Sequence, residues 1–266
     1  MAVGDMFDHF ILTRFNVREP WTEQTEHPGL DAGWLKRRFE LFERVCLPSM
    51  ARQTNKSFHW LIFLDEETPD QFVRRLDELS SEHEFLIPIY CEDRREEFVL
   101  NEMKKRTSRG NTRIMTRLDN DDVIHPRMIE DTHSIARKQI KLQDLEQGFF
   151  ISFPFGYSEH ESDYYLQLFR CNPFVSFVSF PDYEKTIFGW DHTKIAEIAP
   201  VIFKYTWPMW GQVIHGENVA NTVRGLYWPW GKCSNLIKPD SEKAARSFAW
   251  QCREFWRSFN RYIFHR

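Results

Sequence analysis

The sequence predicts an α/β fold in which a mostly parallel sheet is covered by helices on both faces. Apolar strands and amphipathic helices alternate through roughly the first 145 residues, a pattern typical of parallel strands joined by crossover helices. Beyond Gly148, short aromatic strands follow one another, and such runs favour antiparallel pairing. We expect an aromatic-rich mixed second half and three segments, namely 1–148, 149–240 and a C-terminal helix over 241–266. The first two are interpreted as halves of one domain, because no Gly/Ser-rich linker separates them.

Four strands are predicted in the first half, each short and rich in branched or aromatic residues. They cover residues 9–17, 58–64, 85–90 and 112–118. The clearest is Phe58–Leu64, a nearly continuous apolar run that suits a strand covered on both faces. In the second half we expect strands over 149–155, 164–169 and 174–180.

The helices are predicted from capping residues and apolar periodicity. Leu35, Phe39, Phe42 and Cys46 recur at spacings of four, three and four, as one buried helical stripe requires. Asp31 can cap this helix, and Pro48 should kink or end it. Further helices are expected over 69–81, 93–106 and 126–145.

Composition excludes several classes of protein. The 266 residues are 42% apolar and 28% charged, as in soluble globular proteins, and no apolar run approaches the ~18 residues of a membrane span. A net charge of −4 gives no basic footprint for nucleic acid. The five cysteines form no C-x-x-C pair, and the first ten residues lack the pattern of a signal peptide, so we expect a cytoplasmic protein with reduced thiols.

An acidic cluster follows the fourth predicted strand. Asp119, Asp121 and Asp122 lie within four residues, with Asn120 between them. Ligands of open α/β sheets bind beyond the carboxyl ends of the strands, and two Asp at i and i+2 can converge on Mg²⁺ or Mn²⁺ that also binds phosphate oxygens. A cation would also relieve the repulsion among the carboxylates. The alternative is an Asx-rich turn in which Asp122 caps the next helix.

Four stretches in order resemble one family of enzymes. They are 9–16, 53–69, 116–122 and 208–221. The third resembles the DxD segment of GT-A-fold glycosyltransferases, and the set is similar to the putative rhamnosyltransferase family over roughly residues 9–225. The resemblance implies a GT-A-like, Rossmann-type sheet and a metal-dependent, inverting transfer of a sugar, with rhamnose as the candidate. The donor would be dTDP- or UDP-linked, and the acceptor a glycan or a lipid-linked glycan.

The resemblance also implies roles on the donor side. Asp65 would accept the N3–H of a uracil or thymine ring; its alternative is a helix cap. Thr13 and Arg14 would border the nucleotide, although an Arg at a strand end is often a surface ion pair. Arg117 would bind diphosphate or pair within the acidic cluster, and Arg224 belongs to a segment that could close over phosphate.

The metal site implied by the resemblance has three members. Asp121 would be the principal ligand, and Asp119 would contact the ribose or share the cation. His215 would complete the site and favour Mn²⁺ over Mg²⁺, because imidazole suits manganese better. The alternative for His215 is a structural histidine.

Candidates for the acceptor side lie in the second half. Inverting transfer needs a general base, and we choose Asp191 over Asp182 and Glu184, because it adjoins an aromatic ring and a histidine; a helix N-cap is its alternative. Trp190, Trp210 and also Trp207 are candidates for an acceptor platform, with burial in the core as the alternative.

The tail is predicted to be an amphipathic helix. Phe248, Cys252, Phe255 and Phe259 form an apolar stripe, and Arg253, Arg257 and Arg261 a basic one. Such a helix could contact an anionic membrane peripherally, or dock on its own domain with a solvated basic face.

Two other functions compete with sugar transfer. Asp119–Val123 also fits the DxDx[TV] signature of haloacid-dehalogenase-like phosphohydrolases, whose first Asp is a nucleophile. That family carries the motif on its first strand, whereas three strands precede it here. The other alternative is a non-catalytic carbohydrate-binding protein, which would have no need for the acidic cluster.

Overall fold

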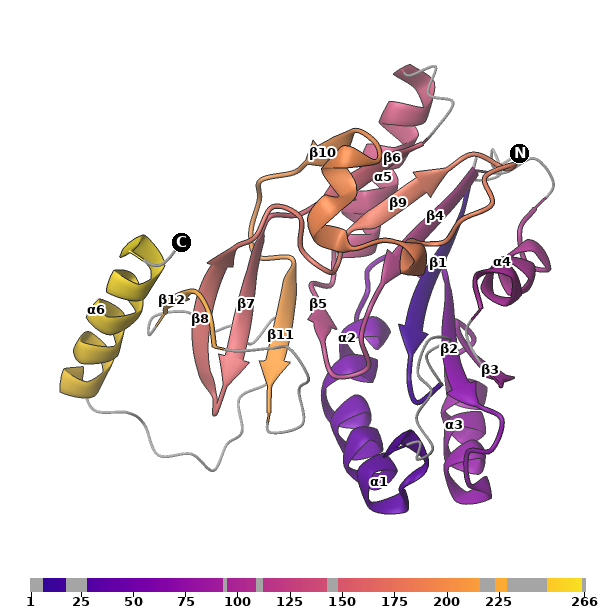
Figure 1. The fold of residues 1–266 in the computed structure, drawn as a ribbon, viewed down its shortest axis with the longest axis horizontal. Helices are drawn as coiled ribbons and strands as arrows, with labels where there is room; N and C mark the ends of the chain where they lie inside the picture. The colour runs from indigo at the N-terminus through magenta and orange to yellow at the C-terminus, as the bar shows by residue number, and fades with distance from the viewer. Residues whose placement is uncertain are drawn as a thin grey trace.

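The computed structural model describes residues 7–17, 28–92, 95–108, 112–142, 148–215, 223–228 and 248–264 (Figure 1). Within these ranges the strands form a seven-stranded sheet and a five-stranded sheet. Helices pack on both faces of the larger sheet.

The parallel part of the larger sheet comes from the first half of the chain. Its strands are β1 (Phe7–Arg14), β2 (His59–Asp65), β3 (Leu86–Cys91) and β4 (Thr112–Arg117), in the order β3-β2-β1-β4. All neighbours in this part pair in parallel, so their carboxyl ends share one edge. The four strand predictions are confirmed.

The second half extends the same sheet. β9 (Ser176–Ser179) pairs antiparallel with β4 and with β6 (Phe149–Ser152), as the aromatic pattern predicted. β10 (Val201–Phe203) then adds to β6 in parallel.

Helices cover both faces of the larger sheet, which confirms the predicted α/β class. The apolar cluster on one face includes residues of α1 (Ala32–Leu41), α3 (Asp70–Glu82) and α5 (Met128–Leu142). The cluster on the other face includes residues of α4 (Glu96–Lys104) and of the 3₁₀ turns Ile187–Gly189 and His192–Glu197. Side chains alternate along each strand, so neighbouring residues such as Ile11 and Leu12 enter opposite clusters. A further 3₁₀ turn, Pro28–Leu30, precedes α1.

The first helical segment continues past Pro48 to Ala51, so the proline does not end it. Asp31 caps α1 by accepting a hydrogen bond from the Trp34 N–H at 2.7 Å, as predicted. A π-helical turn, Phe42–Cys46, then leads into α2 (Leu47–Ala51). Pro48 lies in the first turn of α2, where the absence of its N–H costs little.

The second sheet connects the acidic cluster to a distant part of the chain. It consists of β5 (Val123–Ile124), β7 (Phe155–His160), β8 (Asp163–Leu168), β11 (Trp210–Ile214) and β12 (Leu226–Tyr227), in the order β12-β8-β7-β11-β5. β5 directly follows the acidic cluster and pairs antiparallel with β11, so that the end of β11 returns toward that cluster.

The C-terminal helix packs on this second sheet, and the face that it buries is not the predicted apolar stripe. In α6 (Phe248–Phe264), beside β12 in Figure 1, Glu254 and Ser258 are buried while Cys252 of the stripe is exposed. The Tyr227 N–H donates to Ser258 Oγ at 2.8 Å. Residues 241–247 of the predicted helix lie outside the described ranges. No helix in the described part of the chain is long and apolar enough to cross a membrane.

A chain of buried polar side chains crosses the larger sheet. His9 on β1 shares hydrogen bonds with His133 on α5 and with Thr116 Oγ1 on β4, both at 2.9 Å. Thr116 Oγ1 in turn lies 2.5 Å from Ser176 Oγ on β9. Burial first, and then the nearby His133, lower the pKa of His9 well below its usual value. The ring is therefore neutral in the folded protein.

We predict that folding stability falls with acidification partly because of His9. Unfolding restores a pKa near 6.5, so below about pH 6.5 the unfolded chain binds one more proton and the free energy of unfolding falls by about 1.4 kcal/mol per pH unit. Above that range this group contributes no slope. When the free energy of unfolding is measured with urea between pH 5 and 8, it should depend less steeply on pH for His9→Gln than for wild type. Equal slopes would contradict the assignment.

Candidate functional site

The acidic cluster forms a turn at the carboxyl edge of the parallel strands. We call residues 119–122 the acidic turn. The Leu118 N–H, just before it, donates to Leu12 O of β1 at 3.1 Å, and the Asp122 N–H closes the turn on Asp119 O at 3.2 Å. Three carboxylates therefore lie where open α/β sheets bind their ligands.

The structure brings Asp121 and His215 together, although 94 residues separate them in sequence. Asp121 is 6% exposed, and its Oδ2 lies 2.9 Å from His215 Nε2. His215 directly follows β11, so the β5–β11 pairing is what carries it to the turn. The two side chains are thus neighbours, and the metal-binding role that the resemblance implies for them stays a prediction.

Arg38 is a member of the site that the sequence analysis missed. Its Nη1 donates to Asp121 Oδ2 at 3.0 Å and lies 3.3 Å from His215 Nε2. Its Nη2 donates to Asn120 Oδ1. Arg38 lies on α1, next to Phe39 of the buried stripe. A basic residue beside a core position was the one feature of the sequence that could have pointed to it.

Asp119 points toward two arginines instead of toward Asp121. Arg117 Nη2 lies 2.9 Å from Asp119 Oδ2, and Arg14 Nη2 lies 3.6 Å from Oδ1. Burial raises the pKa of Asp119, but Arg117, Arg14 and Arg38 outweigh it and leave the pKa below its usual value. Arg117 thus makes the ion pair that we considered as its alternative.

Asp122 lies inside the protein and does not cap α5. The Val213 N–H of β11 points to its Oδ1 at 3.4 Å, and α5 begins six residues later in the sequence, at Met128. Burial, Asp121 and Asp119 raise its pKa well above the usual value.

Two predicted donor-side residues are buried. Thr13 is 0% exposed, and its hydroxyl donates to Leu118 O at 2.6 Å and accepts from the Trp60 indole at 2.8 Å. The prediction that Thr13 borders the nucleotide is therefore wrong, because its side chain points into the core. Asp65 is 1% exposed at the end of β2, where its Oδ1 accepts from the Glu67 N–H at 2.8 Å. It holds the turn before α3, whose N-cap is Pro69.

The segment 187–193, which contains Asp191, lies close to the arginines that pair with Asp119. The Arg14 guanidinium lies over the Phe188 ring, 5.7 Å from its centroid. Burial and Arg117 lower the pKa of His192, while Asp191 and Asp119 act to raise it. Asp191 itself is exposed and caps the 3₁₀ turn, with its Oδ1 2.7 Å from Thr193 Oγ1. Hydrogen bonds from Thr193 lower its pKa.

Of the candidate platform residues, Trp210 is ruled out by burial. It is 0% exposed, stacks on Phe174 with ring centroids 5.0 Å apart, and donates its indole N–H to Phe153 O at 2.8 Å. A side-chain Cβ at Gly156 would overlap the Trp210 ring, so the glycine makes room for it. Trp190 is partly buried against Phe177, with ring centroids 4.7 Å apart, so only part of its ring is accessible to a ligand.

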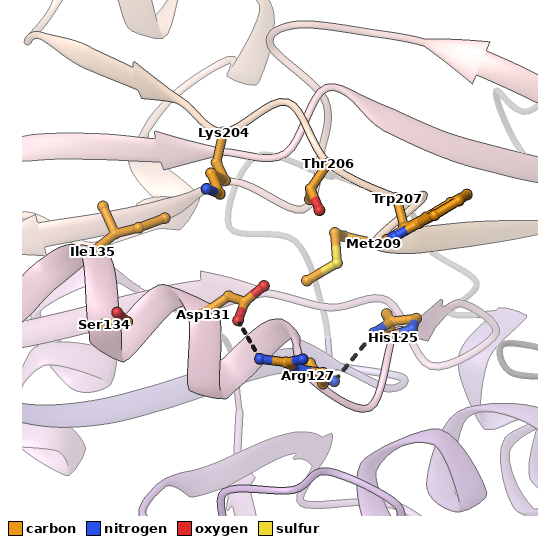
Figure 2. A pocket seen from close by; sticks show the side chains of 9 residues that line it. All are labelled: His125, Arg127, Asp131, Ser134, Ile135, Lys204, Thr206, Trp207 and Met209. Atoms are coloured by element: carbon orange, nitrogen blue, oxygen red, sulfur yellow. Dashed lines mark hydrogen bonds and ion pairs between the residues drawn. The ribbon is translucent and has the colours of Figure 1, made fainter.

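Trp207 is the exposed one, at 80%, and lies at a cavity of about 400 Å³ (Figure 2). This cavity is also lined by His125, Arg127, Asp131 and Lys204. The His125 N–H donates to Met209 O at 2.8 Å, so the cavity lies at the end of the β5–β11 pair opposite the acidic turn.

The donor atoms at the acidic turn suit a divalent ion in type. A carboxylate oxygen of Asp121 and an imidazole nitrogen of His215 are ligands that Mn²⁺ accepts. Within the described residues, however, no three His, Cys, Asp or Glu side chains are gathered around one point. Arg224 is exposed just before β12.

Comparison with known proteins identifies the family. The family described as "Putative rhamnosyl transferase" matches residues 7–227, so the chain belongs to this family. No curated protein matches the chain at a significant level.

Among solved structures, the chain is similar to TarS of S. aureus. For TarS 1-349 the TM-score is 0.44 and the identity 11%, over 77% of this chain and 60% of that one. For TarS 1-349 in complex with UDP-GlcNAc the TM-score is 0.48 and the identity 10%, over 81% and 62%. The chain therefore spans about 60% of the length of these TarS chains.

We predict very unequal losses of stability for two tryptophans that are close in sequence. Trp210→Ala should lower the free energy of unfolding by about 3–5 kcal/mol, because it leaves a cavity in the core and an unpaired carbonyl. Trp207→Ala should change it by no more than about 0.5 kcal/mol, because the ring is exposed. Urea titration of both variants measures the difference, and equal losses would refute the assigned environments.

Proposed function

We propose that this protein transfers a sugar, with rhamnose as the candidate, from a dTDP- or UDP-linked donor to a glycan or a lipid-linked glycan. The observation that carries the proposal is the meeting of Asp121 and His215 at the carboxyl edge of the parallel strands, in a chain of this family. A phosphohydrolase is disfavoured, because the acidic turn follows the fourth strand and the Asp119 carboxylate is bound by Arg117 and Arg14.

The donor would lie along the edge where β1, β2 and β4 end. Arg14 and Arg117 are each about one-quarter exposed and close together on Asp119, so their guanidinium groups can turn to a diphosphate. Asp65, at the end of β2, is the candidate for reading the base; because it is 1% exposed and accepts from the Glu67 N–H, the turn after β2 would have to open for the base to reach it. Arg224 remains a candidate for the phosphates.

Asp121 and His215 would hold Mn²⁺ or Mg²⁺, with Asp119 as the third candidate ligand. When bound, such an ion would neutralise the charge that develops on the departing diphosphate. The chain's own arginines supply positive charge at the same place.

The acceptor would approach from the side of residues 187–193. Asp191 is the candidate base for inverting transfer, because its carboxylate is exposed and adjoins Trp190 and His192 in the sequence. The exposed side of α6 carries Arg253, Arg257 and Trp256, which supports a peripheral contact with an anionic membrane that holds a lipid-linked acceptor.

Asp121→Asn should abolish Mn²⁺-dependent binding of UDP or dTDP while the protein stays folded, because it removes the ligand charge and keeps the shape of the side chain. Isothermal titration with nucleotide and Mn²⁺ measures the binding. Asp131→Asn, the same change on α5, is the control and should bind as wild type does. Unchanged titration heats for Asp121→Asn would refute the role of Asp121.

Asp191→Asn should lower kcat by about 10²–10⁴-fold, as expected for loss of a general base. The dissociation constant of the donor should stay the same, because Asp191 belongs to the acceptor side. Turnover assays and donor titrations on one preparation separate the two effects. Loss of donor affinity without loss of kcat would place Asp191 outside the base role.

A further inference from the structure

The Arg38 guanidinium is held at the acidic turn by groups from three parts of the chain. Asp121 and Asn120 accept hydrogen bonds from it, and His215 Nε2 lies 3.3 Å away. The Trp34 side chain, one helical turn earlier on α1, places its ring centroid 5.5 Å from Arg38 Cζ. Only 12% of the Arg38 side chain is exposed. The guanidinium is therefore fixed against the very oxygen and nitrogen that a divalent ion would use.

Arginines balance the charge of the acidic turn without any added ion. Asp119 is paired with Arg117 and Arg14, and Asp121 is paired with Arg38. For Asp119 and Asp121, the arginines of the protein thus already offset the repulsion that led us to expect a cation, whereas Asp122 has a raised pKa instead. A divalent ion placed on Asp121 would meet the positive charge of Arg38 at close range, where the intervening dielectric is low.

We propose that Arg38 is a built-in counter-cation, which occupies Asp121 and His215 in the free protein and is released to the diphosphate of an arriving donor. The inference rests on the proposed function and deepens it. Arg38 keeps the affinity for a divalent ion low until the nucleotide is present. The planar guanidinium matches phosphate oxygens in pairs, so a diphosphate offers it a partner as good as Asp121. Metal and nucleotide then bind with positive coupling.

A purely structural Arg38 makes a different prediction. If it only braced the acidic turn, its removal would loosen Asp121 and His215 and weaken ion binding. If it competes with the ion, its removal strengthens ion binding. The sign of the change in affinity for the ion alone, with no nucleotide and no turnover, therefore decides between the two roles.

The experiment is isothermal titration of Mn²⁺ into wild type, Arg38→Gln and Arg37→Gln. Arg37 is exposed on the same helix, so its variant loses the same charge away from the turn. We expect Arg38→Gln to bind Mn²⁺ at least about tenfold more tightly than wild type, and Arg37→Gln to match wild type. Added UDP or dTDP should tighten Mn²⁺ binding by wild type more than by Arg38→Gln. Equal or weaker Mn²⁺ binding by folded Arg38→Gln overturns the inference.

Arg38→Lys serves as a second variant in case Arg38→Gln does not fold. It keeps the charge and loses the planar fork, so its affinity for Mn²⁺ alone should stay near that of wild type while the coupling to nucleotide shrinks. Full coupling in this variant overturns the inference. If wild type binds Mn²⁺ with nucleotide, Asp121→Asn does not, and Arg38→Gln equals wild type, then only this inference fails. If wild type binds neither under any condition, the proposed function fails as well.

Discussion

The pairing of β5 with β11 is the constraint on which the site depends. β5 has two residues and follows the acidic turn, and the register opposes Trp210 to Ile124 and Gly211 to Val123. On its other side β11 is held by the burial of Trp210 against Gly156 of β7, since a slip of β11 by one residue would turn the indole to the opposite face. Core packing of one aromatic ring thereby sets the position of His215, five residues further along the chain.

Charge at the site is arranged as opposed pairs rather than as a bare acidic pocket. The guanidinium groups come from the end of β1, the end of β4 and the middle of α1, so three separate elements each bring one positive charge to the turn. Asp122 is the exception, since it faces a backbone N–H and its pKa is raised. Such a site is suited to anionic ligands, because a guanidinium that pairs with a carboxylate can pair with a phosphate oxygen in the same way.

The parts of the fold that were predictable from sequence are those that depend on local pattern. The four parallel strands carry buried apolar runs, and Asp31 caps α1 through its own neighbours. Of the second sheet, β8 was predicted as the strand over 164–169, whereas β5 and β12 were missed because they have two residues each and exist only through distant partners. Trp207 and Trp210 lie in similar local sequence, yet one is 80% and the other 0% exposed, since tertiary packing alone decides between them. Arg38 was missed for the same reason: no motif on α1 records what lies opposite its side chain.

The π-helical turn between α1 and α2 has a geometric consequence for the site. Its Leu47 N–H bonds to Phe42 O, five residues back, which means that the turn contains one residue more than a regular helix would. Each residue of an α-helix rotates the side-chain direction by about 100°. Deleting one residue between 42 and 46 would therefore restore a continuous helix and rotate α1 by about 100° relative to the sheet edge. In such a shortened protein both helices would stay intact, but the Arg38 guanidinium would point away from the acidic turn.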